Sequence, residues 1–193
     1  MRILLVNQGT LDAAETGLPL APLSGALAAA GHEVRRLAID NHDPADAQAF
    51  LQLSDPQLAA YRDVLRQALD AEIDAFDPHI VHVQPIWVLA HLALEAGAPY
   101  VLTASGVELP VYRLDPRFRR LTEEAAENAG RIIATSEAVR LEMIAAFGDL
   151  DGRVVTMPAE LAEPLESGAE AVRWLIEIYR RVLIDRFGAC PES

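Results

Sequence analysis

The sequence lacks the features that mark secreted and membrane-spanning proteins. It contains a single cysteine, Cys190, and one cysteine cannot form an internal disulfide. No apolar run approaches the ~20 residues of a membrane-spanning helix. The apolar opening, residues 1–7, is too short for the core of a signal peptide. We therefore expect a cytoplasmic protein with no integral membrane segment.

Basic charge is scarce as well. The 193 residues carry 16 basic and 29 acidic side chains, which gives a formal net charge of −13. Such a surface repels phosphate backbones and anionic lipid head groups, so nucleic acid is not expected as a partner. Four arginines gather near residue 115, and this pattern is typical of a solvated helix face: Arg113, Arg117, Arg119 and Arg120.

Several motifs of nucleotide, hydrolase and metal chemistry are also missing. The chain has no G-x-G-x-x-G after its first strand, no Walker A sequence and no G-x-S-x-G elbow. His79 and His82 are three residues apart in a predicted strand, which points them to opposite faces. No metal site is therefore predicted, and His82 is interpreted as a hydrogen-bonded histidine within the sheet.

What the chain has is a globular composition, with 51% apolar and 23% charged residues. Short β-branched runs alternate with longer helical patterns. The expected strands are residues 2–6, 33–39, 79–83, 99–103, 131–135 and 153–157. The expected helices are residues 20–30, 54–76, 86–96, 115–130, 136–147 and a last one that ends at Gly188. Capping boxes are expected at Ser54–Gln57 and Ser167–Glu170.

This alternation predicts one α/β fold, a doubly wound, mostly parallel six-stranded Rossmann-like sheet with helices on both faces. Residues 1–160 form the predicted Rossmann-like domain. Residues 161–193 are a connector and a C-terminal helix, which packs back on the sheet and completes the same domain.

Ligands of open parallel sheets bind beyond the carboxyl ends of the strands, at the switch point in strand order. This rule selects residues after five of the strands: Asn7, Gln8, Gly9, Gln84, Trp87, Ser105, Gly106, Glu108, Ser136, Glu137 and Glu160. Their amides, hydroxyls and carboxylates suit a hydroxyl-rich ligand, and Trp87 offers an apolar platform for a sugar face. Glu108, Glu137 and Glu160 are candidates to converge. The alternative is that these are ordinary turn and cap residues, Ser136 above all.

Three segments resemble family 4 glycosyltransferases in their order and spacing. They are residues 77–87 (DPHIVHVQPIW), 99–106 (PYVLTASG) and 129–148 (AGRIIATSEAVRLEMIAAFG). The resemblance spans nearly residues 1–160. It implies the acceptor-side half of a GT-B fold, in which two Rossmann-like domains face each other and transfer is metal-independent with retention. The last helix, residues 171–188, is similar to the family's closing helix, so the chain resembles an enzyme without its donor domain.

The resemblance also marks departures from the family pattern. Ser105 stands at the position of a loop histidine, and Gln84 stands where a second strand-three histidine is common. The double glycine near the donor phosphates is reduced to Gly17, and the hinge reads Pro158, Ala159 and Glu160. No catalytic residue is therefore assigned. No resident cofactor is implied, and a nucleotide sugar is the possible donor substrate.

Three functions stay open at this point. The first is the acceptor-side half of a sugar-transferring enzyme, completed by a donor-domain protein or by a homodimer. The second is a non-catalytic module that binds a sugar-bearing small molecule or a protein. The third is an unrelated Rossmann-like or flavodoxin-like binding protein, since a fold alone carries no function.

Overall fold

A computed structural model describes residues 1–8, 18–39, 51–148, 150–158 and 169–190. Six strands form one sheet in the order β2-β1-β3-β4-β5-β6, and every neighbouring pair is parallel. The strands are β1 (Arg2–Gln8), β2 (Glu33–Ile39), β3 (Ile80–Gln84), β4 (Tyr100–Ala104), β5 (Arg131–Ala134) and β6 (Val154–Thr156). The predicted six-stranded Rossmann-like sheet is confirmed.

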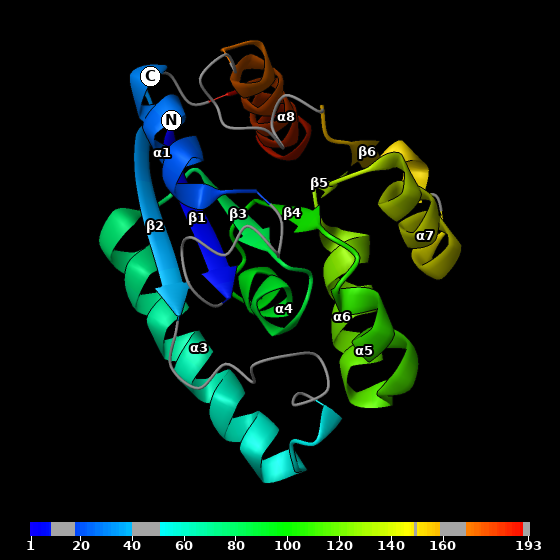
Figure 1. Cartoon of the computed structure of the whole chain (residues 1–193). Coiled ribbons are helices and arrows are strands. Elements are labelled where there is room, and N and C mark those ends of the chain that lie inside the picture. Colours follow the sequence, from blue (N-terminus) through cyan, green and yellow to red (C-terminus); the bar gives the residue numbers. More distant parts are fainter. Residues whose placement is uncertain (9–17, 40–50, 149, 159–168, 191–193) are drawn as a thin grey trace.

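In the described part of the chain, seven α-helices, labelled as in Figure 1, cover the two faces of this sheet. They are α1 (Leu20–Ala29), α3 (Asp55–Phe76), α4 (Val88–Glu95), α5 (Glu108–Leu114), α6 (Pro116–Asn128), α7 (Glu137–Phe147) and α8 (Ala169–Phe187). A short 3-10 helix, η2 (Leu150–Gly152), precedes β6. Among the helices that the structure describes, none is long and apolar enough to span a membrane.

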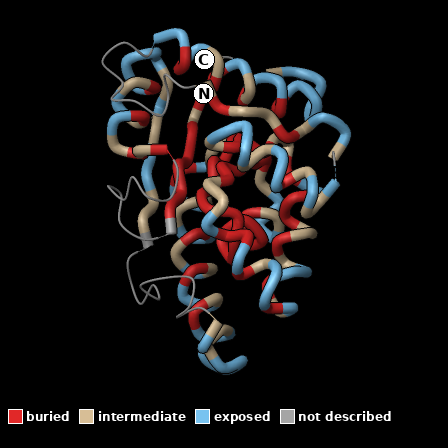
Figure 2. The backbone as a smooth tube through the Cα atoms, turned by 45° about the vertical axis from the view of Figure 1, so that its right-hand side comes forward, coloured by how far each residue is buried: buried red, intermediate tan, exposed pale blue. Residues whose placement is uncertain are grey.

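Successive residues of each strand enter two separate cores. Ile3 and Leu5 of β1 pack with α1 and α8, whereas Leu4 and Val6 pack on the side of α3, α4, α5, α6 and α7. Burial on both faces is why the inner strands read as largely apolar runs, whereas the edge strand β2 carries the exposed Arg35 and Arg36. Figure 2 shows the buried residues along the strands in the middle of the molecule.

The capping box predicted at the start of α3 is confirmed. Ser54 donates its backbone N–H to Gln57 Oε1 at 2.9 Å, and the two residues form a capping box. The helix buries one stripe and ends at Asp77, whose φ of 48° is left-handed. The other predicted capping box, Ser167–Glu170, and the connector before it lie mostly outside the described residues.

Two helices differ from the prediction. The helix predicted at 86–96 begins only at Val88, and α5, from Glu108 to Leu114, is a helix that was not predicted. Helix α5 is short and contains Pro110. A proline is tolerated there because the first N–H groups of a helix have no intrahelical partner.

The C-terminal helix is held on the sheet by a buried polar contact. His82 of β3 lies between two hydroxyls, Tyr179 Oη of α8 at 2.6 Å and Thr103 Oγ1 of β4 at 2.7 Å. All three side chains are buried, and burial lowers the pKa of His82 to about 3. A neutral imidazole supplies one donor and one acceptor to the two hydroxyls. The predicted hydrogen-bonded histidine is thus confirmed.

Candidate functional site

The switch point lies between the carboxyl ends of β1 and β3. From β1 the chain continues to β2 on one side, and from β3 it continues to β4 on the other. Asn7 and Gln84 are paired across these two strand ends. An open α/β sheet forms its ligand crevice at such a reversal. Asn7 is buried there, Gln8 ends β1, and Gly9 and Gly17 lie outside the described residues.

Gln84 uses both ends of its amide on the chain itself. Its Oε1 accepts from the Leu18 N–H at 3.0 Å, and its Nε2 donates to the Leu18 carbonyl at 2.8 Å. Both contacts are buried, and Leu18 lies two residues before Leu20, the first residue of α1. Gln84 therefore positions the start of α1 beside the switch point.

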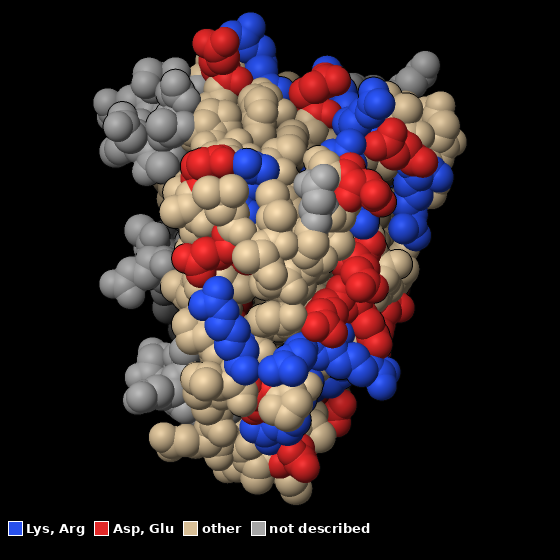
Figure 3. All heavy atoms as spheres, turned by 90° about the vertical axis from the view of Figure 1, so that its right-hand side faces the viewer, with Lys and Arg blue, Asp and Glu red and all other residues tan. Residues whose placement is uncertain are grey.

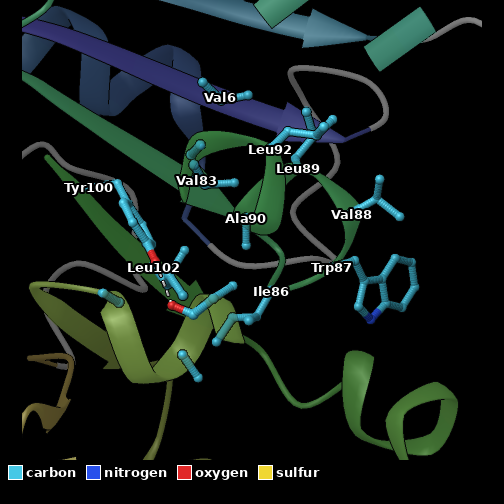
Figure 4. Packing of buried hydrophobic residues seen from close by; sticks show 14 of the residues in the cluster. Val6, Val83, Ile86, Trp87, Val88, Leu89, Ala90, Leu92, Tyr100 and Leu102 are labelled. Atoms are coloured by element: carbon cyan, nitrogen blue, oxygen red, sulfur yellow. Dashed lines mark hydrogen bonds between the residues drawn. The ribbon is translucent and has the colours of Figure 1, made fainter. Parts of the chain in front are cut away.

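Trp87 is enclosed by the core. Its side chain is 9% exposed and belongs to the same apolar cluster as Ile86 and Val88. Figure 4 shows Trp87 at the rim of this cluster, beyond the side chains of β1, β3 and β4 that pack around α4. Little of the indole face that we expected to meet a sugar is left open to solvent.

Ser105 and Glu108 form a pair after β4. Ser105 Oγ donates to Glu108 Oε2 at 3.3 Å, while Glu108 Oε1 is buried and has no hydrogen-bond partner among the described residues. Burial raises the pKa of Glu108. Gly106 has a φ of 93°, and a Cβ there would lie 3.3 Å from Val139 of α7, so this loop runs close to the next helix.

The pKa of Glu137, which follows β5, is shifted in the opposite direction to that of Glu108. Arg140 donates to both of its oxygens, at 2.8 and 2.7 Å, and Thr156 Oγ1 donates to Oε2 at 2.7 Å. These hydrogen bonds lower the pKa of Glu137 to about 2. Ser136 is the expected N-cap of α7, since its Oγ accepts from the Val139 N–H at 3.2 Å. Glu160, the third carboxylate expected here, lies outside the described residues.

The stability of the Glu108→Gln variant relative to wild type should increase as the pH rises. The folded-state pKa of Glu108 is raised, so the folded state holds its proton where the unfolded state, with a pKa of about 4.3, has lost it. Wild-type stability therefore falls as the pH rises above the unfolded pKa, and the glutamine variant lacks this loss. Urea unfolding between pH 4 and pH 8 measures the difference.

Glu137→Gln is the matched control with the opposite sign. A lowered folded-state pKa contributes stability that is present above the unfolded pKa of about 4.3 and is lost as the pH falls towards 2. This variant should be less stable than wild type at neutral pH and equal to it in strong acid. Parallel pH curves for the two variants would contradict both assignments.

Three of the four clustered arginines form ion pairs with carboxylates. Arg113 contacts Glu142, Arg117 contacts Asp115 and Asp55, and Arg120 contacts Glu124. Arg119 donates to the Arg113 carbonyl and lies over the Tyr112 ring. Figure 3 shows acidic and basic side chains next to one another on this face. The solvated-face interpretation is confirmed.

Sequence reasoning missed a difference between the helix N-termini at this edge. Helices α3, α6 and α7 begin with polar side-chain caps, Ser54 with Gln57, Asp115 and Ser136. Helices α1, α4 and α5 begin after Pro19, Trp87 and Val107 without a side-chain cap, and of these three only α5 has an acidic residue, Glu108, in its first turn. Helices α1 and α4 follow β1 and β3, so their N-termini flank the switch point.

An uncapped N-terminus presents unpaired N–H groups and the positive end of the helix dipole, which together favour an anion. This applies to α1, where Ala21 in the first turn is partly exposed, because Val88, Leu89 and Ala90 at the start of α4 are fully buried. The missing caps can be read from the sequence, because no Ser, Thr, Asp or Asn stands directly before Leu20 or Val88. That these helix starts lie beside the switch point follows only from the strand order of the structure.

Within the described ranges, no group of three histidine, cysteine or carboxylate side chains is placed to hold a metal ion.

Solved structures of nucleotide-sugar enzymes share this fold. The chain aligns with UDP-GlcNAc 2-epimerase from Neisseria meningitidis, solved with UDP-GlcNAc, at 16% identity and a TM-score of 0.58, over 97% of this chain and 54% of the epimerase. It also aligns with UDP-GlcNAc 2-epimerase from Methanocaldococcus jannaschii at 12% identity and a TM-score of 0.56, over 81% of this chain and 45% of that epimerase. These likenesses concern the fold alone, and the chain spans about half the length of both epimerases.

Sucrose-phosphate synthase from Thermosynechococcus elongatus matches in two forms. The first aligns at 16% identity and a TM-score of 0.63, over 94% of this chain and 99% of that one. The second aligns at 15% and 0.56, over 80% of this chain and 47% of that one. The present chain therefore has the extent of the shorter form.

Sequence comparison identifies the family. A search among curated proteins gives no match. Residues 20–159, well over half of the chain, match the profile of Glycosyltransferase Family 4. The motif order, the parallel Rossmann-like sheet and this profile agree with one another. The chain belongs to glycosyltransferase family 4.

Proposed function

We propose that this protein is the acceptor-side half of a sugar-transferring enzyme, and that a donor domain from another chain or from a second copy completes it. The observation that carries the proposal is the N-terminus of α1 beside the switch point, which has no side-chain cap and no acidic residue in its first turn. It favours a negative group by about 0.3–1 kcal/mol. A nucleotide sugar carries such a group in its diphosphate, and the Neisseria meningitidis epimerase was solved with one, UDP-GlcNAc.

The need for a second half is supported by the side chains at this edge. The Gln84 amide is occupied by Leu18, and the Glu137 carboxylate is occupied by Arg140 and Thr156. Among the described residues at this edge, these two side chains are therefore not available for the transfer step. An open half-cleft also leaves water around the reacting groups, which weakens electrostatic catalysis.

The same proposal includes the domain organisation and the location. Residues 1–160 and 161–193 act as one domain in the cytoplasm. The contact of Tyr179 with His82 supports the first part, because it joins the last helix to the central strands.

The second candidate function is a non-catalytic module that binds a sugar-bearing ligand or a protein. Ser105 favours it, because this serine occupies the position of the family's loop histidine and donates to Glu108. The two functions differ in turnover. Adding a donor-domain chain should produce sugar transfer in the first case and only binding in the second.

A thermal-shift panel with UDP-, GDP-, ADP- and dTDP-sugars tests the proposal. A ligand of the folded state adds ~2.7 kcal/mol at a hundredfold excess over its dissociation constant. We expect Ala21→Asp, in the first turn of α1, to weaken this binding by about fivefold or more. Two unit charges about 4 Å apart in water repel by about 1 kcal/mol, which corresponds to about that factor.

Ala28→Asp is the matched control, since it adds the same charge at the other end of the same helix, on an exposed residue. It should leave nucleotide-sugar binding unchanged. Equal losses in the two variants would contradict binding at the α1 N-terminus. No thermal shift with any nucleotide sugar, with or without a donor-domain chain, would contradict the proposed function.

A further inference from the structure

A pocket of about 550 Å³ lies beside the end of β6, outside the switch point. Its walls are Pro158, just after β6, and one face of α8. The α8 residues are spaced by three, four and seven positions, which places them on the same side of the helix: Glu170, Ala171, Arg173, Trp174 and Glu177. This pocket has no part in the site described above.

Trp174 is the more accessible of the two tryptophans in the chain. It is half-buried, packs against the core between α8 and the sheet, and also lines the pocket. Trp87 is enclosed on the other side of the sheet. Trp174 thus provides the flat aromatic surface that was expected at Trp87.

The polar groups around Trp174 select a class of ligand. Glu170 and Glu177 accept hydrogen bonds and Arg173 donates them, so the pocket presents both kinds of partner to a hydroxyl group. Two carboxylates against one guanidinium leave a net negative charge, which disfavours phosphates and other anions. A neutral molecule with many hydroxyls and an apolar face fits this set.

We propose that the pocket between Pro158 and Trp174 binds a neutral saccharide. The Trp174 ring supports the apolar face of a sugar, Glu170 and Glu177 accept from its hydroxyls, and Arg173 donates to them. The pocket lies at the carboxyl end of β6, on the same edge of the sheet as the switch point. Only the identification of this saccharide with part of the acceptor rests on the proposed function.

Indole NMR signals of the ¹⁵N-labelled full chain test the proposal. The chain has two tryptophans and therefore two indole N–H signals, which Trp174→Phe assigns. The probes are glucose, mannose and N-acetylglucosamine with their linear trisaccharides. We expect at least one to shift the Trp174 signal saturably while the Trp87 signal stays in place.

Glu177→Gln should weaken this binding by about threefold to tenfold, the effect of one weakened hydrogen bond. Arg180→Gln, at an exposed residue of the same helix outside the pocket, should leave it unchanged. A Trp174 signal that stays in place with every saccharide, or moves equally in the Glu177 and Arg180 variants, would overturn the proposal. Because no nucleotide is present, this result is independent of the thermal-shift panel.

Discussion

Tyr179→Ala is expected to lower the free energy of unfolding by about 3–5 kcal/mol, the range for removing a large buried aromatic side chain. The Tyr179 ring is fully buried between α8 and the sheet and meets the His82 ring edge-on, with centroids 5.7 Å apart. Truncation removes this packing and leaves a ring nitrogen of His82 without its partner. Urea unfolding followed by circular dichroism measures the loss.

Tyr179→Phe separates the hydrogen bond from the ring. It keeps the packing and leaves His82 Nδ1 buried without a partner, which should cost about 1–3 kcal/mol. Tyr112→Phe is the control, because its hydroxyl, which donates to Glu123, is only part-buried. If both phenylalanine variants lost equally little, the buried contact of α8 with β3 would not be a source of stability.

The strands and most helices were predictable because their signals are local. Apolar runs marked most of the strands, and short-range caps such as Ser54 with Gln57 and Ser136 marked helix starts. Helix α5 was not predictable in the same way. It has seven residues including Pro110, and its buried Glu108 and Leu109 are stabilised by packing that the local sequence does not reveal.

The edge of the sheet that holds the candidate site could be predicted, but the switch point could not. Parallel strands put the loop residues at the carboxyl edge, whereas the strand order of the structure locates the reversal between Asn7 and Gln84. The partner of Gln84 is Leu18, 66 positions away, and no spacing rule connects them. Trp87 and Trp174 differ in exposure for the same reason, because each depends on which helix face meets the sheet.

Gly130→Ala should lower the free energy of unfolding by about 1–3 kcal/mol through overpacking. A Cβ at Gly130, just before β5, would lie 2.4 Å from Val182 Cγ1, 2.7 Å from Cγ2 and 3.1 Å from Cβ. Val182 is buried on α8, and its β-branched side chain has little rotamer freedom in a helix, so rotation cannot relieve the clash. Relief requires α8 or the start of β5 to move.

Two further variants identify the clash as the cause. Gly25→Ala makes the same change in α1 with no atom within 4 Å of the new Cβ, and it should stabilise the protein by about 0.5–1 kcal/mol. The double variant Gly130→Ala/Val182→Ala should lose less free energy of unfolding than the two single variants lose together. We expect the difference to be about 0.5–3 kcal/mol. Strict additivity would contradict the contact. Tyr179 and Val182 lie one turn apart, so single cooperative transitions in both variant series would support α8 as part of the sheet's folding unit.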